Sequence, residues 1–324
     1  MPLIFDLPFD QLESYQGRSP RPQDFDAFWE KSLAEMRAID PQVELIPAEF
    51  KTASATCFHL YFTGVGGARI HAKLLRPLRS PHPHPAVLLF HGYTGDSGDW
   101  YDKLGYVSEG FTLAALDCRG QAGLSEDRGG VAGNTLHGHI IRGLEDALRG
   151  LPEKLLFRQV FLDAAQLARI VMEMPDVDAD RVGATGSSQG GALTIACSAL
   201  EPRIKRAAPI FPFLSDYKRV WEMDQAKDAY LELQEYFRHS DPTHKLEDSV
   251  FEKLGYIDIQ FLAPLIRAEV MWAIGLMDTV CPPSTQFAVY NKIISPKGMT
   301  IYPDFGHEPL PGLNDQVFQF MMGL

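Results

Sequence analysis

Apolar residues follow two patterns along the 324-residue chain, and each pattern predicts a different kind of strand. Near the N-terminus, short runs alternate apolar with polar residues and end in turn-forming residues, which is typical of antiparallel strands. These runs cover residues 43–50, 57–64 and 68–77. Residues 84–93 and 111–120 are instead continuous apolar runs, and this pattern indicates strands buried on both faces of a parallel sheet.

Segments with helical periodicity lie between and after these strands. Residues 24–38 place apolar side chains at helical spacing and predict an amphipathic helix. The remaining elements continue the alternation, with helices expected at 158–174, 189–200, 283–293 and 315–324 and strands at 180–186, 206–214 and 268–278. Strands that alternate with helices predict an α/β fold, in which a mostly parallel central sheet carries helices on both faces.

The pattern indicates a single domain over residues 1–324, because no linker separates a second unit. Residues 1–40 precede the main alternation and contain the amphipathic helix, so we expect a helical N-terminal extension. A helix-rich stretch at about 217–264 interrupts the alternation and predicts a helical insertion over the edge of the sheet.

The composition is that of an ordinary globular protein, with 45% hydrophobic and 22% charged residues. The net charge of −12 argues against partners such as nucleic acids and anionic membrane surfaces, which attract basic proteins. The chain contains no run of about 18 apolar residues, so we expect no membrane span. Residues 1–15 lack the basic segment of a signal peptide and carry acidic side chains, which predicts a cytoplasmic protein.

None of the four cysteines has a CxxC partner, and no group of cysteines and histidines has the spacing of a zinc site. Cys118 and Cys197 lie in apolar strand-like and helix-like contexts, where a buried free thiol is the expected state. Cys57 and Cys281 are the other two. We therefore expect no bound metal and no organic cofactor.

The segment GATGSSQGGAL at 183–193 combines a short strand, a sharp turn and the start of a helix. Within it the pattern Gly-x-Ser-x-Gly fits one register, centred on Ser188 and flanked by Gly186 and Gly190, whereas Ser187 fails the pattern. Larger side chains at the two flanks would clash in so sharp a turn. Ser188 is therefore a candidate nucleophile at the positive end of a helix. The alternative is a glycine-rich turn with an N-capping serine.

A serine nucleophile needs a general base, and in the α/β-hydrolase order an acid and then a histidine follow the serine. Three histidines lie downstream, namely His239, His244 and His307. The first two lie in a polar stretch that we expect to be an exposed loop. His307 follows a strand-like segment and precedes the final helix, which is where the base is expected. The alternative is that His307 is an ordinary surface histidine.

The best candidate for the acid is Asp278, which ends the apolar run at 268–278 and precedes a proline-led helix. A carboxylate at that place would orient the imidazole and stabilise its positive charge. Asp304 is a rival, but it lies three residues before His307 and suits a turn better. Glu308 is adjacent to the histidine and could not easily reach around to its ring.

The developing oxyanion needs two N–H donors. One comes from the residue after the nucleophile, which is Gln189 here, and the other comes from the loop after the strand at 84–93. That loop begins His91-Gly92 and places the backbone N–H of Tyr93 as the second donor. We expect the Tyr93 ring to contact substrate as a wall of the acyl pocket. The alternative for this segment is an ordinary glycine-rich turn.

Several segments resemble the carbohydrate esterase family that contains acetyl xylan esterases and cephalosporin-C deacetylases, within the α/β-hydrolase superfamily. They are DCRGQAG at 117–123, TLHGHIIRGL at 135–144, GSSQGG at 186–191 and GHE at 306–308. The opening FDLPFDQLESYQG and the DFDAFWEK helix are also similar to that family, so the resemblance extends over nearly the whole chain. These motifs in this order are far more specific than the serine motif alone.

The resemblance implies an α/β-hydrolase fold and removal of acetyl groups from small substrates such as xylo-oligosaccharides, other acetylated sugars and cephalosporin C. It implies Ser188, Asp278 and His307 as the catalytic triad, with the backbone N–H groups of Tyr93 and Gln189 as oxyanion donors. The Arg-Gly-Gln core of the first segment would support the site structurally. The resemblance also implies a ring-shaped homohexamer whose active sites face an internal cavity.

The chain departs from the family pattern in two places. Residues 142–160 replace a shorter, aromatic-rich stretch, and Ala122 stands where another glycine is expected. Two other functions stay open. One is a peptidase, or an esterase for longer acyl chains, on the same fold, because a fold does not decide chemistry. The other is a non-catalytic α/β-hydrolase that acts as a binding protein.

Overall fold

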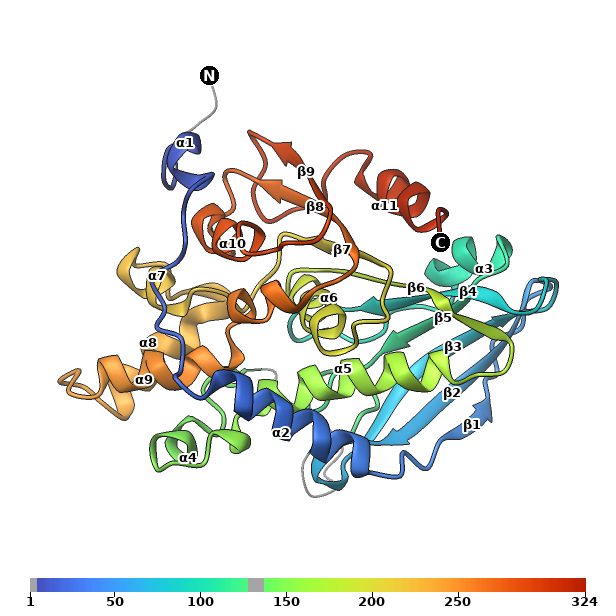
Figure 1. The fold of residues 1–324 in the computed structure, drawn as a ribbon, viewed down its shortest axis with the longest axis horizontal. Coiled ribbons are helices and arrows are strands. Elements are labelled where there is room, and N and C mark those ends of the chain that lie inside the picture. Colours follow the sequence, from blue (N-terminus) through green and yellow to red (C-terminus); the bar gives the residue numbers. More distant parts are fainter. Residues whose placement is uncertain (1–4, 128–136) are drawn as a thin grey trace.

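The computed structural model describes residues 5–127 and 137–324, and these contain a nine-stranded sheet in the order β1-β2-β3-β5-β4-β6-β7-β8-β9 (Figure 1). The strands are β1 (Glu44–Pro47), β2 (Ala55–Thr63), β3 (Arg69–Pro77), β4 (His84–Phe90), β5 (Thr112–Leu116), β6 (Val177–Ser187), β7 (Arg206–Ile210), β8 (Glu269–Gly275) and β9 (Lys297–Tyr302). Pairing is antiparallel from β1 to β5 and parallel from β5 to β9. The predicted mostly parallel sheet with antiparallel strands at its start is confirmed.

The helices surround this sheet. They are α1 (Phe9–Leu12), α2 (Phe25–Ala38), α3 (Leu104–Ser108), α4 (Leu144–Leu148), α5 (Leu156–Met172), α6 (Gln189–Leu200), α7 (Tyr217–Glu222), α8 (Leu231–His239), α9 (Glu247–Leu254), α10 (Pro283–Tyr290) and α11 (Leu313–Met321). No helix in the described part of the chain has the length and apolar character needed to cross a membrane.

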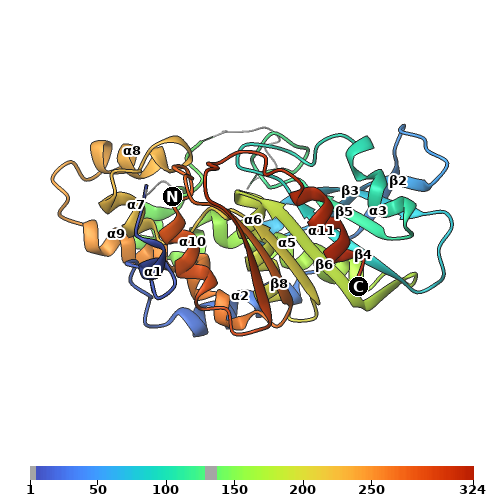
Figure 2. The ribbon, with the colours of Figure 1, turned by 90° about the horizontal axis from the view of Figure 1, so that it is seen from above.

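The apolar runs of the central strands bury side chains on both faces of the sheet. In β4, Ala86 and Leu88 pack into one core with α5, α6 and α10, whereas Val87 packs into a second core with α11. Successive side chains of a strand point to opposite faces, so a continuous apolar run requires helices on both sides. Helices α3 and α11 lie side by side (Figures 1 and 2), where the Tyr106 and Phe318 rings are 5.0 Å apart.

Several predicted strands are shorter in the structure than the apolar runs suggest, and two of them show the difference most clearly. The run at 111–120 leaves the sheet after Leu116, and the run at 206–214 leaves it after Ile210. In the second case Phe211 and Leu214 have φ values of 31° and 64°, which a strand cannot accommodate. The chain stays buried while it turns beyond both strand ends, but only the second end is followed by apolar residues, since Asp117 and Arg119 follow the first.

The N-terminal segment packs against the main body through aromatic residues. Helix α2 lies along α5, where the Trp29 and Phe161 rings stack at 6.1 Å, and Phe9 of α1 meets Phe287 of α10 at 6.0 Å. Residues 1–4 of the predicted extension lie outside the described residues, as do the first two residues of the segment at 135–144. The predicted single domain stays a prediction.

The stretch at 217–264 is helical, as predicted, and its helices α7, α8 and α9 gather at one end of the sheet, on the left in Figures 1 and 2. One expectation for this stretch is wrong in part. His239 is the last residue of α8 rather than part of a loop, although both His239 and His244 are exposed as expected. All four cysteines are buried free thiols.

Candidate active site

Ser188 lies at the junction of β6 and α6, where the chain turns from strand into helix. Its φ of 58° and ψ of −120° are values that residues other than glycine rarely adopt. The backbone around it holds this conformation, because the Ser188 N–H donates to the Ile210 carbonyl at 3.0 Å and the Phe213 N–H donates to the Ser188 carbonyl at 3.0 Å. The strained turn that the motif requires is therefore present.

The flanking glycines allow β4, β6 and α6 to approach closely. A Cβ atom on Gly186 would lie 2.4 Å from the Phe90 carbonyl oxygen, and one on Gly190 would lie 2.0 Å from the same atom. Because these are backbone contacts, no side-chain movement relieves them. The spacing of the motif thus follows from the packing of the serine turn against the end of β4.

His307 and Asp278 form a hydrogen-bonded pair. Asp278 follows β8 and His307 follows β9, and these neighbouring parallel strands bring the two loops together. The Nδ1 atom of His307 lies 2.8 Å from Oδ2 of the fully buried Asp278. The other carboxylate oxygen accepts hydrogen bonds from the N–H groups of Val280 and Cys281 at 2.9 and 2.8 Å. Both carboxylate oxygens of Asp278 are thereby held in place. Nε2 is the His307 ring nitrogen that does not bond to Asp278.

The Cys281 thiol connects this pair to the serine. The thiol lies beside the Ser188 side chain, and its sulfur lies within 4.8 Å of both the Asp278 carboxylate and a His307 ring nitrogen. Burial raises the pKa of Cys281 well above its usual value, so the thiol stays protonated. The hydrogen bonds of the described residues do not join Ser188 directly to His307, a contact that often tightens only when substrate binds.

The candidate oxyanion donors lie on either side of Ser188. Gln189 is the first residue of α6, where backbone N–H groups have no acceptor within the helix. Among the hydrogen bonds of residues 5–127 and 137–324, none uses the N–H of Tyr93 or of Gln189. The loop that carries Tyr93 is held by the next residue, because the Thr94 N–H donates to Gln121 Oε1 at 2.9 Å.

The Tyr93 side chain is anchored by the helical insertion. Its ring packs against Phe213 and His139, with centroids 5.5 and 5.4 Å away, and its hydroxyl donates to Glu232 of α8. Glu232 is buried, which raises its pKa, and it also accepts a hydrogen bond from the Ile140 N–H at 2.6 Å. Sequence reasoning missed Glu232, because an isolated acidic residue in an amphipathic helix carries no signal of a distant partner. The expected role of the ring as a pocket wall stays a prediction.

The Arg-Gly-Gln segment at 119–121 hydrogen-bonds to α5, to the Tyr93 loop and to Gln189. The buried Arg119 makes two hydrogen bonds of 2.6 Å to Asp163 of α5, which is the bidentate geometry that suits a guanidinium and a carboxylate. Gln121 and Gln189 exchange hydrogen bonds through their side-chain amides, at 2.7 and 3.1 Å. Gln121 therefore links the Tyr93 loop to the residue after Ser188, in agreement with the supporting role that the resemblance implies.

The alanine at position 122, where the family pattern has a glycine, has a steric explanation. Ala122 is exposed, so a methyl group in place of a hydrogen meets no constraint. The next residue, Gly123, is different, because a Cβ atom there would lie 2.1 Å from the carboxylate carbon of Asp117. That carboxylate is held by His71 Nδ1 at 2.6 Å and by two backbone N–H groups. These bonds outweigh the effect of burial, so the pKa of Asp117 lies below its usual value.

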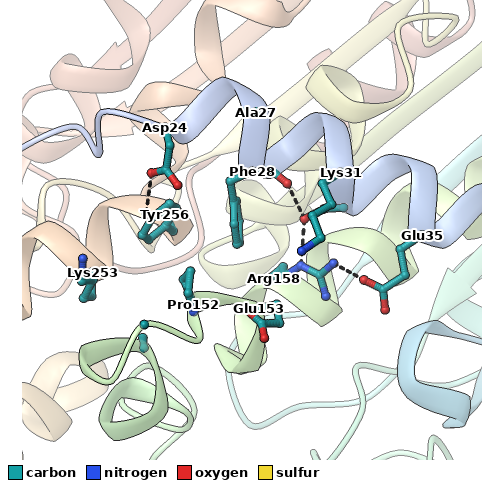
Figure 3. A pocket seen from close by; sticks show the side chains of 13 residues that line it. Asp24, Ala27, Phe28, Lys31, Glu35, Pro152, Glu153, Arg158, Lys253 and Tyr256 are labelled. Carbon is teal, nitrogen blue, oxygen red and sulfur yellow. Dashed lines mark hydrogen bonds and ion pairs between the residues drawn. The ribbon is translucent and has the colours of Figure 1, made fainter.

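A separate pocket of about 550 Å³ lies between α2, the segment after α4 and the end of α9 (Figure 3). Phe28 and Tyr256 line it together with Arg158, whose Nε donates to Ser32 Oγ at 2.8 Å and whose Nη2 contacts Glu35 at 2.5 Å. The guanidinium is thus bonded within the protein and joins the N-terminal extension to α5. None of the predicted catalytic residues lines this pocket.

Comparisons with known proteins agree with the motifs and the geometry. A family model described as acetyl xylan esterase (AXE1) matches residues 1–324. The crystal structure of acetyl xylan esterase 1 from Thermoanaerobacterium sp. JW/SL YS485 is 55% identical, with a TM-score of 0.94 over 98% of this chain and 99% of that one. An acetyl xylan esterase from Paenibacillus sp. R4 is 32% identical, with a TM-score of 0.90 over 98% and 99% of the two chains.

A curated relative is more distant. Acetyl esterase Axe7A from Xylanibacter ruminicola is 26% identical over 288 residues, which make up 87% of this chain but 62% of that protein. This chain therefore spans less than two thirds of that relative's length. The similarity to solved acetyl xylan esterases confirms the predicted α/β-hydrolase fold. The chain belongs to the acetyl xylan esterase family of carboxylic ester hydrolases.

Proposed function

We propose that this protein is a serine esterase that removes acetyl groups from small acetylated substrates through an acetyl-enzyme on Ser188. The observation that carries the proposal is the 2.8 Å hydrogen bond between His307 Nδ1 and the buried Asp278, formed beside a serine in a strained turn. A histidine oriented by a carboxylate is the base that a serine hydroxyl needs. The relatives are an acetyl esterase and two acetyl xylan esterases, which supports the acetyl group as the acyl part.

In the proposed reaction, His307 takes the proton of Ser188 as the hydroxyl oxygen attacks the acetyl carbonyl. Asp278 stabilises the imidazolium and keeps the ring in the tautomer with Nε2 free. The N–H groups of Tyr93 and Gln189 bind the oxyanion, an effect worth about 3 kcal/mol for each donor. The intermediate collapses, His307 protonates the departing alcohol, and water then hydrolyses the acetyl-enzyme. No step of this acyl transfer draws on a metal or an organic cofactor.

The substrates that we propose are acetylated xylo-oligosaccharides, other acetylated sugars and the acetyl ester of cephalosporin C. We further propose that the chain forms a homohexamer with enclosed active sites, which would limit access to small esters. Similarity to acetyl xylan esterases over nearly the full length of two solved chains supports the sugar esters. The hexamer and the cephalosporin substrate rest on the motif resemblance.

An acetate-release screen tests the proposed substrates. Purified protein is incubated with acetylated xylo-oligosaccharides, glucose pentaacetate and cephalosporin C, and free acetate is measured over time. We expect release from all three. A parallel series of p-nitrophenyl acetate, butyrate and octanoate tests the acyl group, and we expect the rate to fall with chain length. A rate that rises with chain length would contradict a small acetyl pocket and favour an esterase for longer acyl chains.

A further inference from the structure

A cluster of two histidine side chains and one aspartate side chain lies at the opposite edge of the sheet from Ser188. Its members are His82, His84 and Asp176. His84 is the first residue of β4, and Asp176 immediately precedes β6, which pairs with β4 in parallel. The His84 N–H donates to the Asp176 carbonyl at 2.9 Å, so the backbone itself holds the two residues together. The cluster is at the amino ends of the parallel strands, whereas Ser188 is at a carboxyl end.

The three side chains converge. One ligand atom of each residue lies within 4.8 Å of a ligand atom of the other two. A tetrahedral zinc ion with bonds of about 2.1 Å places its ligand atoms about 3.4 Å apart. His84 and Asp176 are buried, whereas His82 is exposed and can close the remaining gap by a change of side-chain rotamer. The Pro83 carbonyl between the two histidines accepts a hydrogen bond from Arg181 at 2.8 Å, which restrains this segment.

Two buried atoms of the cluster, His84 Nδ1 and Asp176 Oδ1, have no hydrogen-bond partner among the residues that the structure describes. Their residues are otherwise bonded. His84 Nε2 lies 2.7 Å from Thr112 Oγ1, and Asp176 Oδ2 accepts hydrogen bonds from Arg76 at 2.6 and 2.9 Å. A buried polar atom without a partner costs about 1–3 kcal/mol, so two such atoms in one cluster call for an explanation.

The bonded atoms are those that a metal site would use to orient its ligands. A ligating histidine normally gives its other ring N–H to an acceptor, which leaves the first nitrogen with a free lone pair. Thr112 provides that acceptor for Nε2, and Arg76 orients the Asp176 carboxylate by donating a hydrogen bond to it. The Pro81 carbonyl lies near the His84 ring, but it does not provide Nδ1 with a hydrogen bond.

We propose that His82, His84 and Asp176 form a binding site for zinc, with one imidazole nitrogen of each histidine and one carboxylate oxygen of Asp176 as ligands and a water molecule completing the tetrahedron. Two imidazoles and one carboxylate are a donor set that suits zinc. The ion joins the start of β4 to the turn before β6, so its effect is to stabilise the fold. The site takes no part in acyl transfer. Sequence reasoning missed the site because no cluster of cysteines and histidines has zinc spacing, and Asp176 lies far from the two histidines in the sequence.

Calorimetric titration with zinc chloride tests this site. The wild-type protein is compared with His82→Ala, which removes an exposed ligand at little cost in packing, and with Asp176→Asn. His239→Ala, which removes an exposed histidine of α8, is the matched control. We expect the wild type and the control to bind zinc alike, and the two site variants to bind at least about tenfold more weakly. At a zinc concentration about one hundred times Kd, we expect the wild-type Tm to rise by about 4 °C.

Asp278, Cys281 and His307 also bring ligand atoms within 4.8 Å of one another, so zinc bound there must be distinguished. His307→Ala removes a ligand from that group and leaves the proposed site intact. We expect His307→Ala to retain zinc binding and the rise in Tm, and the His82→Ala/His307→Ala double variant to lose both. The proposal is overturned if wild-type protein binds no zinc, if His82→Ala binds as the wild type does, or if His307→Ala abolishes binding.

Discussion

At the scale of the residue, the proposed nucleophile is held in a conformation that costs a non-glycine residue roughly 1–3 kcal/mol. The Ser188 N–H donates to Ile210, and its carbonyl accepts hydrogen bonds from Ala192 and Phe213. The surrounding backbone therefore fixes the serine before any substrate arrives. Preorganisation of this kind is how a site aligns a nucleophile without reordering it during the reaction.

A substitution of the Tyr93 side chain tests whether the hydroxyl or the backbone N–H of this residue acts in catalysis. Its hydroxyl is bonded to Glu232, whereas the proposed catalytic group is its backbone N–H. We expect Tyr93→Phe to keep kcat on p-nitrophenyl acetate within about tenfold of wild type and to lower the free energy of unfolding by about 1–3 kcal/mol, because the buried Glu232 loses a donor. Steady-state kinetics and urea unfolding measure the two effects.

Tyr101→Phe is the matched control, because Tyr101 is 75% exposed. This substitution should change neither kcat on p-nitrophenyl acetate nor the free energy of unfolding. A Tyr93→Phe enzyme that loses its activity and keeps its stability would show that the hydroxyl takes part in catalysis.

The residues found by pattern are those that local structure determines. Ser188 was predictable because a tight strand-to-helix turn requires glycines at fixed offsets, and Asp278 and His307 because each follows an apolar run that forms a strand. Glu232 contacts Tyr93 although 139 residues separate them in the sequence, and the pattern of apolar and polar residues in α8 does not predict that contact. The sequence likewise does not predict that Cys281 lies beside Ser188. The catalytic roles of the triad stay a prediction.

At the scale of the element, the active-site geometry depends on the close approach of α6 to the end of β4. The contact occurs where Gly190 faces the Phe90 carbonyl, at a separation that excludes any side chain. Overpacking costs more when the obstacle is backbone, because neither partner can rotate away.

We expect Gly190→Ala to abolish esterase activity and to lower the free energy of unfolding by at least about 3 kcal/mol, because its Cβ atom would lie 2.0 Å from the Phe90 oxygen. Chemical unfolding and p-nitrophenyl acetate hydrolysis are the measurements. The control is Gly298→Ala in β9, where no atom lies within 4 Å of the added Cβ atom, and it should stay within about 1 kcal/mol of wild type. Equal stability of the two variants would refute this steric account.

The contact between the N-terminal segment and the insertion predicts a dependence on pH. Asp216 accepts hydrogen bonds from Tyr15 and from the Arg18 and Ser19 N–H groups, and its own N–H donates to the buried Asp258. Burial raises the pKa of Asp258 to about 7, with a further contribution from Asp216. The folded state therefore holds this proton more tightly than the unfolded chain, in which the pKa of an aspartate is about 3.9.

A raised carboxyl pKa contributes stability that is fully present below about pH 4 and is lost as the pH rises through about 7. We expect wild-type protein to lose about 2–4 kcal/mol of unfolding free energy relative to Asp258→Asn between these pH values. Urea unfolding of both proteins at several pH values measures the difference. Curves that remain parallel would show that Asp258 has the same pKa in both states.

At the scale of the whole molecule, the order of strands and helices was predictable because each central strand needs apolar residues on both faces, as in β4. The strand ends were less predictable, since Phe211 stays buried after it leaves the sheet. The arrangement brings loops that follow β4, β6, β8 and β9 to one edge, which is where ligands bind in parallel α/β sheets.

The proposed hexamer is a property of the whole molecule and is tested by its mass. Six chains of 36.2 kDa give roughly 217 kDa. We expect size-exclusion chromatography with light scattering to yield this mass at neutral pH, because closed symmetric rings have a fixed number of subunits. A mass near that of one chain would contradict the hexamer and would remove the enclosed cavity as a reason for small substrates.

The central claim is that Ser188 carries the acyl group, and the adjacent Ser187 provides a matched control in the same turn. The most direct measurement is the initial rate of p-nitrophenol release from p-nitrophenyl acetate by Ser188→Ala and Ser187→Ala, with circular dichroism to verify the fold. We predict that Ser188→Ala loses activity by a factor on the order of 10⁶ while Ser187→Ala stays within about tenfold of wild type. Folded Ser188→Ala protein that retains wild-type activity would contradict the account.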